Sequence, residues 1–245
     1  MGLGFRDGFQ PTTTTAQFIH KPWDYNLELA SKTEDGKRFY TTPEGNKYPS
    51  VSTVAGHFSK AGIMAWRKRV GAETANRVSK QASTHGTAVH SICEDYVNNE
   101  EDYYKKKSPA NIEAFKKIKP LMDESIDLVY AQEASLYSDY LKIAGRCDLA
   151  CSWNGVDTIL DFKTSRVEKK EEWIQNYFQQ AAMYAVMAEE RTKIPFPQIV
   201  ILIAVEESNT PQVFVKKRND YIYGAIDNIK TFYNEVLGGW DDGTK

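Results

Sequence analysis

Asp148 and Asp161 are spaced so that a single β-hairpin would place their carboxylates opposite each other. The dipeptide Asn154-Gly155 lies between two alternating segments, which is the strongest short-range signal for a two-residue type I′ turn. With Trp153 paired to Val156, the register sets Asp148 directly across from Asp161. Like charges directly opposite each other on a sheet repel, so such a pair is expected to hold a proton or a cation between its members. Mg²⁺ or Mn²⁺, which prefer hard oxygen ligands, are the expected cofactors.

Lys163 follows Asp161 by two residues, so strand alternation puts both side chains on one face, with Arg146 opposite Lys163. A metal ion held by the two acids would polarise a phosphate and acidify a bound water. The ammonium group of Lys163 would orient that water or stabilise the charge of the transition state. An Asp-x-Lys sequence on its own is common, and most such pairs are ordinary surface ion pairs. The opposed Asp148 is what favours a site for phosphodiester hydrolysis.

The hairpin is also expected to have one apolar face and one charged face. The apolar face would consist of Cys147, Leu149, Cys151, Trp153, Val156, Thr158, Leu160 and Phe162. Together with Cys93, the chain has three cysteines. This odd count without paired spacing indicates small buried hydrophobic residues in a reducing compartment.

Four ordered segments resemble the motifs of the RecB-like branch of the PD-(D/E)XK nuclease superfamily. They are His85 to His90, Gly145-Arg146-Cys147-Asp148, Asp161-Phe162-Lys163-Thr164-Ser165 and Gln180 to Tyr184. Each motif is weak alone, but their order over residues 48–205 is specific. Within that branch the chain is most similar to the mitochondrial genome-maintenance exonucleases and their phage relatives, through Ser50-Val51-Ser52-Thr53 after a Tyr-Pro pair and through the Asp-Phe-Lys-Thr-Ser form of the Asp161 motif.

The resemblance implies a metal centre and a catalytic lysine. Asp148 and Asp161 would be the carboxylate ligands, His90 and the backbone carbonyl of Phe162 would be further ligands, and Lys163 would be catalytic. Without the resemblance, a half-buried structural role is the more common one for a histidine such as His90. Some relatives hold an iron-sulfur cluster with four cysteines, so no cluster is expected for a chain that has three.

Three more residues would belong to the site by resemblance. Gln180 and Tyr184 are four residues apart on an expected helix, so both would point into the site as a catalytic pair. Taken alone, they are equally compatible with a solvated glutamine and a core tyrosine. Glu133, on the strand before the hairpin, would be an additional acidic metal ligand, although an alternating strand also allows it to face solvent.

Candidate DNA contacts combine cations with aromatic side chains or belong to the resembling motifs. Phosphate neutralisation and base stacking are the two interactions that bind single strands, and Trp66 to Arg69 and Tyr103 to Lys107 supply both kinds of group. Such charge runs are more often simply solvated surfaces. The candidates are Ser50, Ser52, Arg67, Lys68, Arg69, Tyr103, Tyr104, Lys105, Lys106 and Arg146.

Composition describes an ordinary globular chain. The 245 residues are 41% hydrophobic, which is enough for a sizeable core, and the formal net charge is −2, so any contact with a polyanion must be local. No segment resembles a membrane span, a secretion signal or a transit peptide, so a cytoplasmic location in a bacterium or a phage-infected host is expected, without membrane partners.

The expected fold is α/β with a restriction-endonuclease-like core: a central mixed β-sheet flanked by helices, with an added N-terminal helical region. Residues 1–35 are expected to form an extended arm, residues 36–130 a hairpin and helical region that contributes His90 and the DNA path, and residues 131–245 the nuclease core, continuous with 36–130. The expected strands are 131–138, 145–163 as the hairpin, 198–205 and 212–216, after a short hairpin at 37–49. The expected helices are a region capped at Ser50 and running to about 82 with an interruption near 56–62, then 84–98, a third ending near 130, 171–190 and 219–237.

These expectations together favour a divalent-metal-dependent DNA exonuclease in replication, repair or recombination, which would prefer single-stranded DNA with a free end and could act with other proteins of those processes. A structure-specific or restriction-type endonuclease is one alternative, and it would also cut circular DNA. A degenerate nuclease fold that only binds DNA ends for a recombination partner is another. Such a protein would be expected to have lost Asp161 or Lys163, and both are present.

Overall fold

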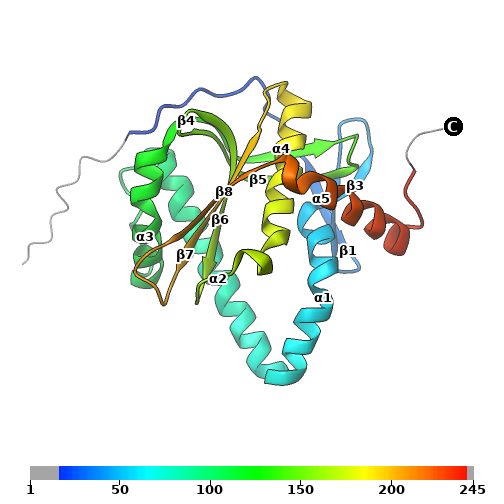
Figure 1. Ribbon diagram of the computed structural model, residues 1–245, viewed down its shortest axis with the longest axis horizontal. Helices are drawn as coiled ribbons and strands as arrows, with labels where there is room; N and C mark the ends of the chain where they lie inside the picture. The colour runs from blue at the N-terminus through cyan, green and yellow to red at the C-terminus, as the bar shows by residue number, and fades with distance from the viewer. Residues whose placement is uncertain (1–16, 242–245) are drawn as a thin grey trace, which may run out of the picture.

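The protein is an α/β structure built on a five-stranded mixed sheet, as expected (Figure 1). A computed structural model describes residues 17–241. The strands, in their order across the sheet, are β4 (Ile126–Ser138), β5 (Ile143–Trp153), β6 (Val156–Ser165), β7 (Gln198–Val205) and β8 (Gln212–Lys217). Only β6 and β7 pair in parallel, because helix α4 (Gln175–Thr192) crosses over between them. The other neighbouring strands are antiparallel.

Helices cover both faces of this sheet, which explains why β7 is a continuous apolar run. Ile199, Ile201 and Ile203 pack into one buried cluster with α4 and α5 (Asn219–Phe232). Val200 and Leu202 point to the opposite cluster, formed with α2 (Ala72–Val97) and α3 (Pro109–Ser125). The central strands are therefore buried on both sides, and polar side chains on them need a partner inside the protein.

Helices α1 (Val51–Val70) and α2 form a long V-shaped hairpin that projects from the sheet (Figure 1). Ser50 caps α1, as expected: its hydroxyl accepts a hydrogen bond from the Thr53 N–H at 3.0 Å. The expected interruption at residues 56–62 and the expected helix start at residue 84 are wrong. The chain instead breaks once, at Gly71, whose φ of +84° suits glycine. A glycine inside a helix costs only about 1 kcal/mol, so the glycines in α1 do not end it.

The N-terminal region is more ordered than expected. β1 (Ala30–Glu34), β2 (Lys37–Thr41) and β3 (Lys47–Pro49) form a second, antiparallel sheet, so the hairpin at 37–49 is confirmed and gains a strand from the expected arm. The β1–β2 turn, Asp35-Gly36, has two positive φ angles, and Asp-Gly is a typical sequence for a two-residue hairpin turn. The hairpin was not expected because β1 is polar and lacks the alternation of a half-buried strand. Before β1, His20 bridges Val129 of β4. Residues 1–16 of the expected arm lie outside the described residues.

Three other boundaries differ from the expectations. The third helix ends at Ser125 and β4 begins at Ile126, because the chain turns directly from the helix into the edge strand of the sheet. A short 3₁₀ turn, Glu171–Trp173, precedes α4, and the last helix changes to a π turn at Tyr233–Leu237. Among the described residues, no helix is both long and apolar enough to cross a membrane.

Candidate functional site

The Asn154-Gly155 turn sets the hairpin register as expected. Both residues have positive φ, and the β5–β6 ladder pairs Trp153 with Val156 and continues to Leu149 with Leu160. The next pair would be Asp148 and Asp161. There the backbone ladder ends, and Oδ2 of Asp148 accepts a hydrogen bond from the Phe162 N–H at 3.0 Å. The side chain of Asp148 therefore takes the place of a backbone acceptor, and this fixes its carboxylate beside β6.

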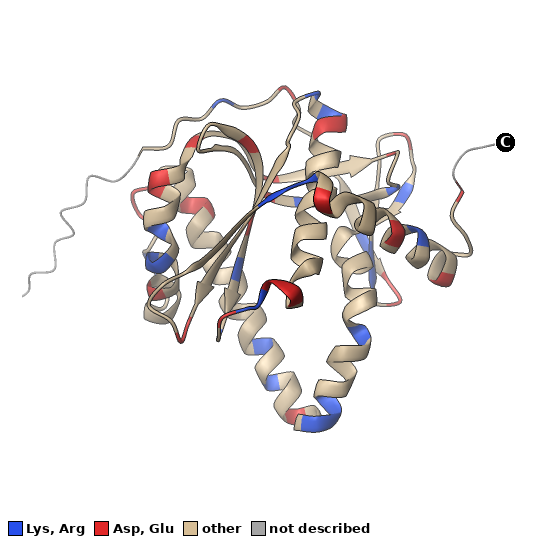
Figure 2. Cartoon of the chain, viewed as in Figure 1, with Lys and Arg blue, Asp and Glu red and all other residues tan. Residues whose placement is uncertain are grey.

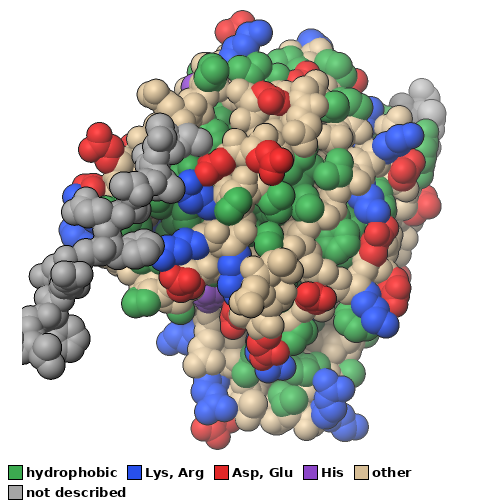
Figure 3. Space-filling model, turned by 60° about the vertical axis from the view of Figure 1, so that its left-hand side comes forward, with side chains coloured by type: hydrophobic (Ala, Val, Ile, Leu, Met, Phe, Trp, Pro, Cys, Tyr) green, Lys and Arg blue, Asp and Glu red, His purple; other side chains and the backbone are tan. Residues whose placement is uncertain are grey.

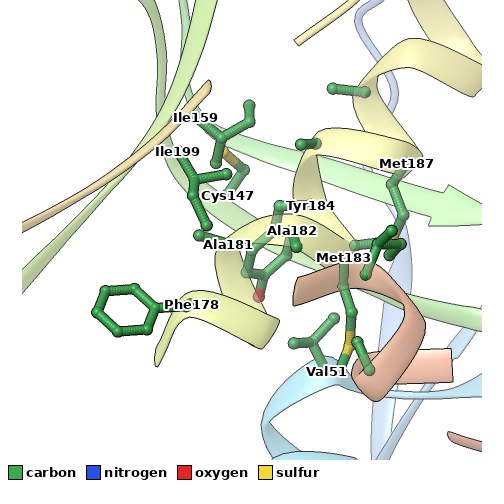
Figure 4. Close-up of a cluster of buried hydrophobic side chains, with 14 of the residues drawn as sticks. Val51, Cys147, Ile159, Phe178, Ala181, Ala182, Met183, Tyr184, Met187 and Ile199 are labelled. Atoms are coloured by element: carbon green, nitrogen blue, oxygen red, sulfur yellow. The ribbon is translucent and has the colours of Figure 1, made fainter. Parts of the chain in front are cut away.

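The alternation of side chains between the two faces of β5 is interrupted at the same point, so the expected apolar face is wrong for one residue, Cys147. Leu149 and Cys151 pack towards α2 and α3, but Cys147 packs on the other side with Ile159, Ile199 and Tyr184 (Figure 4). Strict alternation would have put Cys147 with Leu149. The other face of the hairpin, which was expected to be charged, packs towards α4 and buries Ala150 and Ile159. All three cysteines are buried and free, as expected.

Glu133 on β4 lies across from Asp148, and the regular strand pairing is interrupted at Glu133 as well. Its neighbours Gln132 and Ala134 pair with Leu149 and Cys147, while Glu133 itself has a φ of +47°. Positive φ is uncommon for a residue with a long side chain and costs roughly 1–3 kcal/mol, so it is found mainly where the surroundings impose it. The two strands therefore bend at Glu133 and Asp148.

His90, Glu133 and Asp148 come together in one cluster. A ligand atom from each lies within 4.8 Å of the other two. His90 Nδ1 is 3.4 Å from Oδ2 of Asp148, and the edge of the Phe162 ring packs near the imidazole. The three residues come from α2, β4 and β5, which are distant in sequence. One imidazole nitrogen and two carboxylates are a donor set that suits a divalent cation.

The electrostatics of this cluster favour a bound cation. Burial raises the pKa of Glu133, and the nearby charges of Asp148 and Glu94 raise it further. A raised carboxyl pKa means that the ionised form lacks compensation from the protein. A divalent ion at this position would supply that compensation.

Asp161 lies beside this cluster but has a different partner. It is only 2% exposed and forms an ion pair with Lys163. Burial raises the pKa of Asp161 to about 6; Lys163 opposes this effect, and the charge of Asp148 adds to it. Burial alone would lower the pKa of Lys163, but the charges of Asp161 and Asp148 outweigh it and raise that pKa. The lysine is therefore an ammonium, held next to two carboxylates.

Helix α4 presents an aromatic and polar face to Lys163. The Lys163 ammonium lies over the ring of Tyr177, 5.2 Å from its centroid. Tyr177 was not among the expected site residues. It precedes Gln180 by three residues and Tyr184 by seven, so the helical spacing of the three was a signal for one shared face. Gln180 is partly exposed on this face.

Tyr184 is buried and its position depends on Gly145. A Cβ atom on Gly145 would lie 2.8 Å from both Cε1 and Oη of Tyr184, closer than any side chain allows. Burial, followed by the charge of Asp148, raises the pKa of Tyr184 well above its ordinary value, so its hydroxyl stays protonated. The glycine of the Gly-x-x-Asp segment thus makes room for the tyrosine of α4. The carbonyl of Phe162 as a metal ligand stays a prediction.

The residues expected to contact DNA are spread over several surfaces. Arg67, Lys68 and Arg69 lie at the tip of the α1–α2 hairpin, where Arg67 bonds Asn76 (Figure 2). Ser52 is exposed in the first turn of α1, whereas Ser50 is 2% exposed and occupied as the cap.

The expected stacking loop lies at the opposite end of α2, about 35–40 Å from the hairpin tip by helix length. Tyr103 packs between Tyr96 and Phe115, so its ring is not free to stack on a base. Tyr104 is 44% exposed.

The remaining three cations differ in their partners. Lys105 is paired with Asp102, and Lys106 is exposed. Arg146 does not face Lys163, as the register had suggested, because the ladder has ended. Its guanidinium is instead bonded to Glu28 at 2.7 Å.

No protein-family model matches this chain, and no curated protein matches it either.

Proposed function

We propose that this protein is a divalent-metal-dependent DNA exonuclease of the RecB-like PD-(D/E)XK branch, with a restriction-endonuclease-like sheet. The observation that supports this most directly is the convergence of His90, Glu133 and Asp148 next to the ion pair of Asp161 and Lys163. A site that only stabilised the fold would gain little from gathering three carboxylates inside the protein, because each is costly to ionise there.

In this proposal the metal is held by His90, Glu133 and Asp148, with Asp161 beside them. A divalent ion bound there would polarise the scissile phosphate and lower the pKa of a bound water. With a metal bound, Asp161 would be placed to share its carboxylate between the ion and Lys163, and the Lys163 ammonium would be placed to donate towards the water or the phosphate. Tyr177 limits where that ammonium can move, because its ring covers one side of it.

Contact with a DNA strand is supported by the α1–α2 hairpin. Between residues 51 and 84 the sequence contains six Lys and Arg residues and one Asp or Glu, although the chain as a whole is acidic. The face in Figure 3 has charges of both signs, and basic side chains gather towards its lower end, where this hairpin lies. A projecting basic hairpin beside the cluster would attract a flexible polyanion locally.

A time course on end-labelled linear single-stranded, linear duplex and closed circular single-stranded DNA tests the proposal. Each substrate is incubated with Mg²⁺ or Mn²⁺ and with chelator, using Asp161→Asn as the inactive control. We expect rapid shortening of the linear single strand, slower attack on duplex and little on the circle. Efficient nicking of the circle that is lost in Asp161→Asn would indicate an endonuclease with the same metal site.

A further inference from the structure

A cavity of about 550 Å³ lies away from His90, Glu133 and Asp148, the three residues that are called the metal cluster below. It is bordered by the β1–β2 turn, the first half of α1 and the end of α5. Three of its lining residues are cations from two different elements: Lys37 and Arg38 on β2, and Lys60 on α1.

These three cations are uncompensated within the described residues. None of their side chains forms an ion pair there. Glu34, the cross-strand neighbour of Lys37, is paired with Lys32 and Lys47 instead. The cavity therefore gathers positive charge without a partner for it.

The other ionisable residues of the lining do not change this balance. Asp35 is the acidic residue among them. His57 is occupied by Glu235, at 2.7 Å from its Nε2. The lining consequently contains three cationic residues and one carboxylate, in a chain whose net charge is −2.

Phosphate is the ligand class that fits this lining. Guanidinium and ammonium groups bind its oxygens through charge-assisted hydrogen bonds. An apolar ligand is excluded by the charges, and a cation by their sign.

The cavity is close enough to the metal cluster for one DNA strand to reach both. Ser50, at the start of α1, bridges Ala144 on β5, and Ala144 is four residues from Asp148 on the same strand. Four strand residues span about 13 Å, and the α1 residues that line the cavity, Ser52 to Lys60, add about 3–15 Å of helix beyond Ser50. A strand of several nucleotides covers this separation. We propose that this cavity binds a backbone phosphate of the DNA strand whose scissile phosphodiester lies at the metal cluster, an inference that rests on the function proposed above.

The test is binding of a fluorescein-labelled single-stranded oligonucleotide in chelator, so that nothing is cleaved. The variant is Lys37→Gln combined with Lys60→Gln. The matched control is Lys217→Gln, an exposed lysine on β8 outside the cavity. Anisotropy gives the affinity over a series of salt concentrations. Each phosphate contact to a single strand contributes roughly 0.7 to the slope of log K against log salt, so loss of two contacts should reduce that slope by about 1.4.

The control should keep the slope of the parent protein. An unchanged slope in the double variant, or a reduction in the control that is equal per lysine removed, would overturn the proposal. Competition by inorganic phosphate at concentrations too low to act through ionic strength would indicate a site for free phosphate instead, which also overturns it.

Hydrolysis of bis(p-nitrophenyl) phosphate, which is too small to reach from the cluster to the cavity, separates this inference from the proposed function. The double variant should hydrolyse it at the rate of the parent protein, whereas a reduced rate would mean that the lysines act on the metal cluster. If the parent protein cleaves no DNA but the double variant still shows the expected reduction of slope, the proposed nuclease function is refuted and the phosphate site is supported.

Discussion

Replacing Asp161 with Asn should change how the stability of the metal-free protein depends on pH. Asp161 is 2% exposed, and its burial raises its pKa from 3.8 to about 6. The folded protein then binds this proton more tightly than the unfolded chain does. The parent protein should therefore lose stability as the pH rises from about 4 to about 6, and the loss should be complete above that range.

The size of the effect follows from the same pKa. A rise from 3.8 to about 6 corresponds to roughly 3 kcal/mol of unfolding free energy at neutral pH. The amide introduced by Asp161→Asn would resemble the protonated acid and would not ionise, so the variant should lack this loss. The two proteins should have similar stability near pH 4 and should differ by up to about 3 kcal/mol at pH 7, with the variant more stable.

Urea unfolding followed by circular dichroism, in chelator and at a series of pH values, measures this difference. Addition of Mn²⁺ should stabilise the parent protein more than the variant, because metal binding relieves the same charge. A difference that stays constant with pH, or a variant that is less stable than the parent at pH 7, would refute the argument. It would mean that the ion pair with Lys163 outweighs the cost of burial.

Three further outcomes are expected. Asp148→Asn should remove Mn²⁺ binding in a calorimetric titration and abolish cleavage while the circular dichroism spectrum is retained; retention of most activity would contradict the site. Lys163→Ala should still bind Mn²⁺ and DNA but should lose about 10²–10³-fold in kcat, because the ammonium acts mainly in the transition state; a normal kcat with lost binding would make it a phosphate anchor. Gly145→Ala should destabilise the protein by about 1–3 kcal/mol in urea unfolding, because its Cβ would collide with Tyr184, whereas Gly56→Ala, with open space around it in α1, should be neutral or stabilising.

The parts of the fold that were predictable from the sequence are those fixed by local signals. The Asn154-Gly155 turn set the β5–β6 register because both positions need positive φ, and Ser50 capped α1 as its type and place predicted. The apolar run of β7 identified a strand buried on both faces. These signals lie within a few residues of the features they determine.

The parts that were missed depend on contacts between distant segments. The bend at Glu133 and Asp148 exchanges the faces of two strands, and it lies where the Asp148 side chain bonds the Phe162 N–H. The hydrophobic pattern of β5 does not indicate the hydrogen bond between Asp148 and Phe162, so the prediction put Cys147 on the wrong face. The bend also brings Glu133 into the cluster with His90, while Asp161 is occupied by Lys163. Residue types alone did not distinguish these two acids.

The most direct test of the nuclease assignment is the rate of hydrolysis of linear single-stranded DNA as Mn²⁺ is titrated, for the parent protein and for Asp148→Asn. Both proteins are first shown to be folded. We predict a rate that rises with Mn²⁺ and saturates for the parent, returns to zero with chelator, and stays at background for the variant. Cleavage that persists in chelator, or in Asp148→Asn at the parent rate, would contradict a metal-dependent site at His90, Glu133 and Asp148.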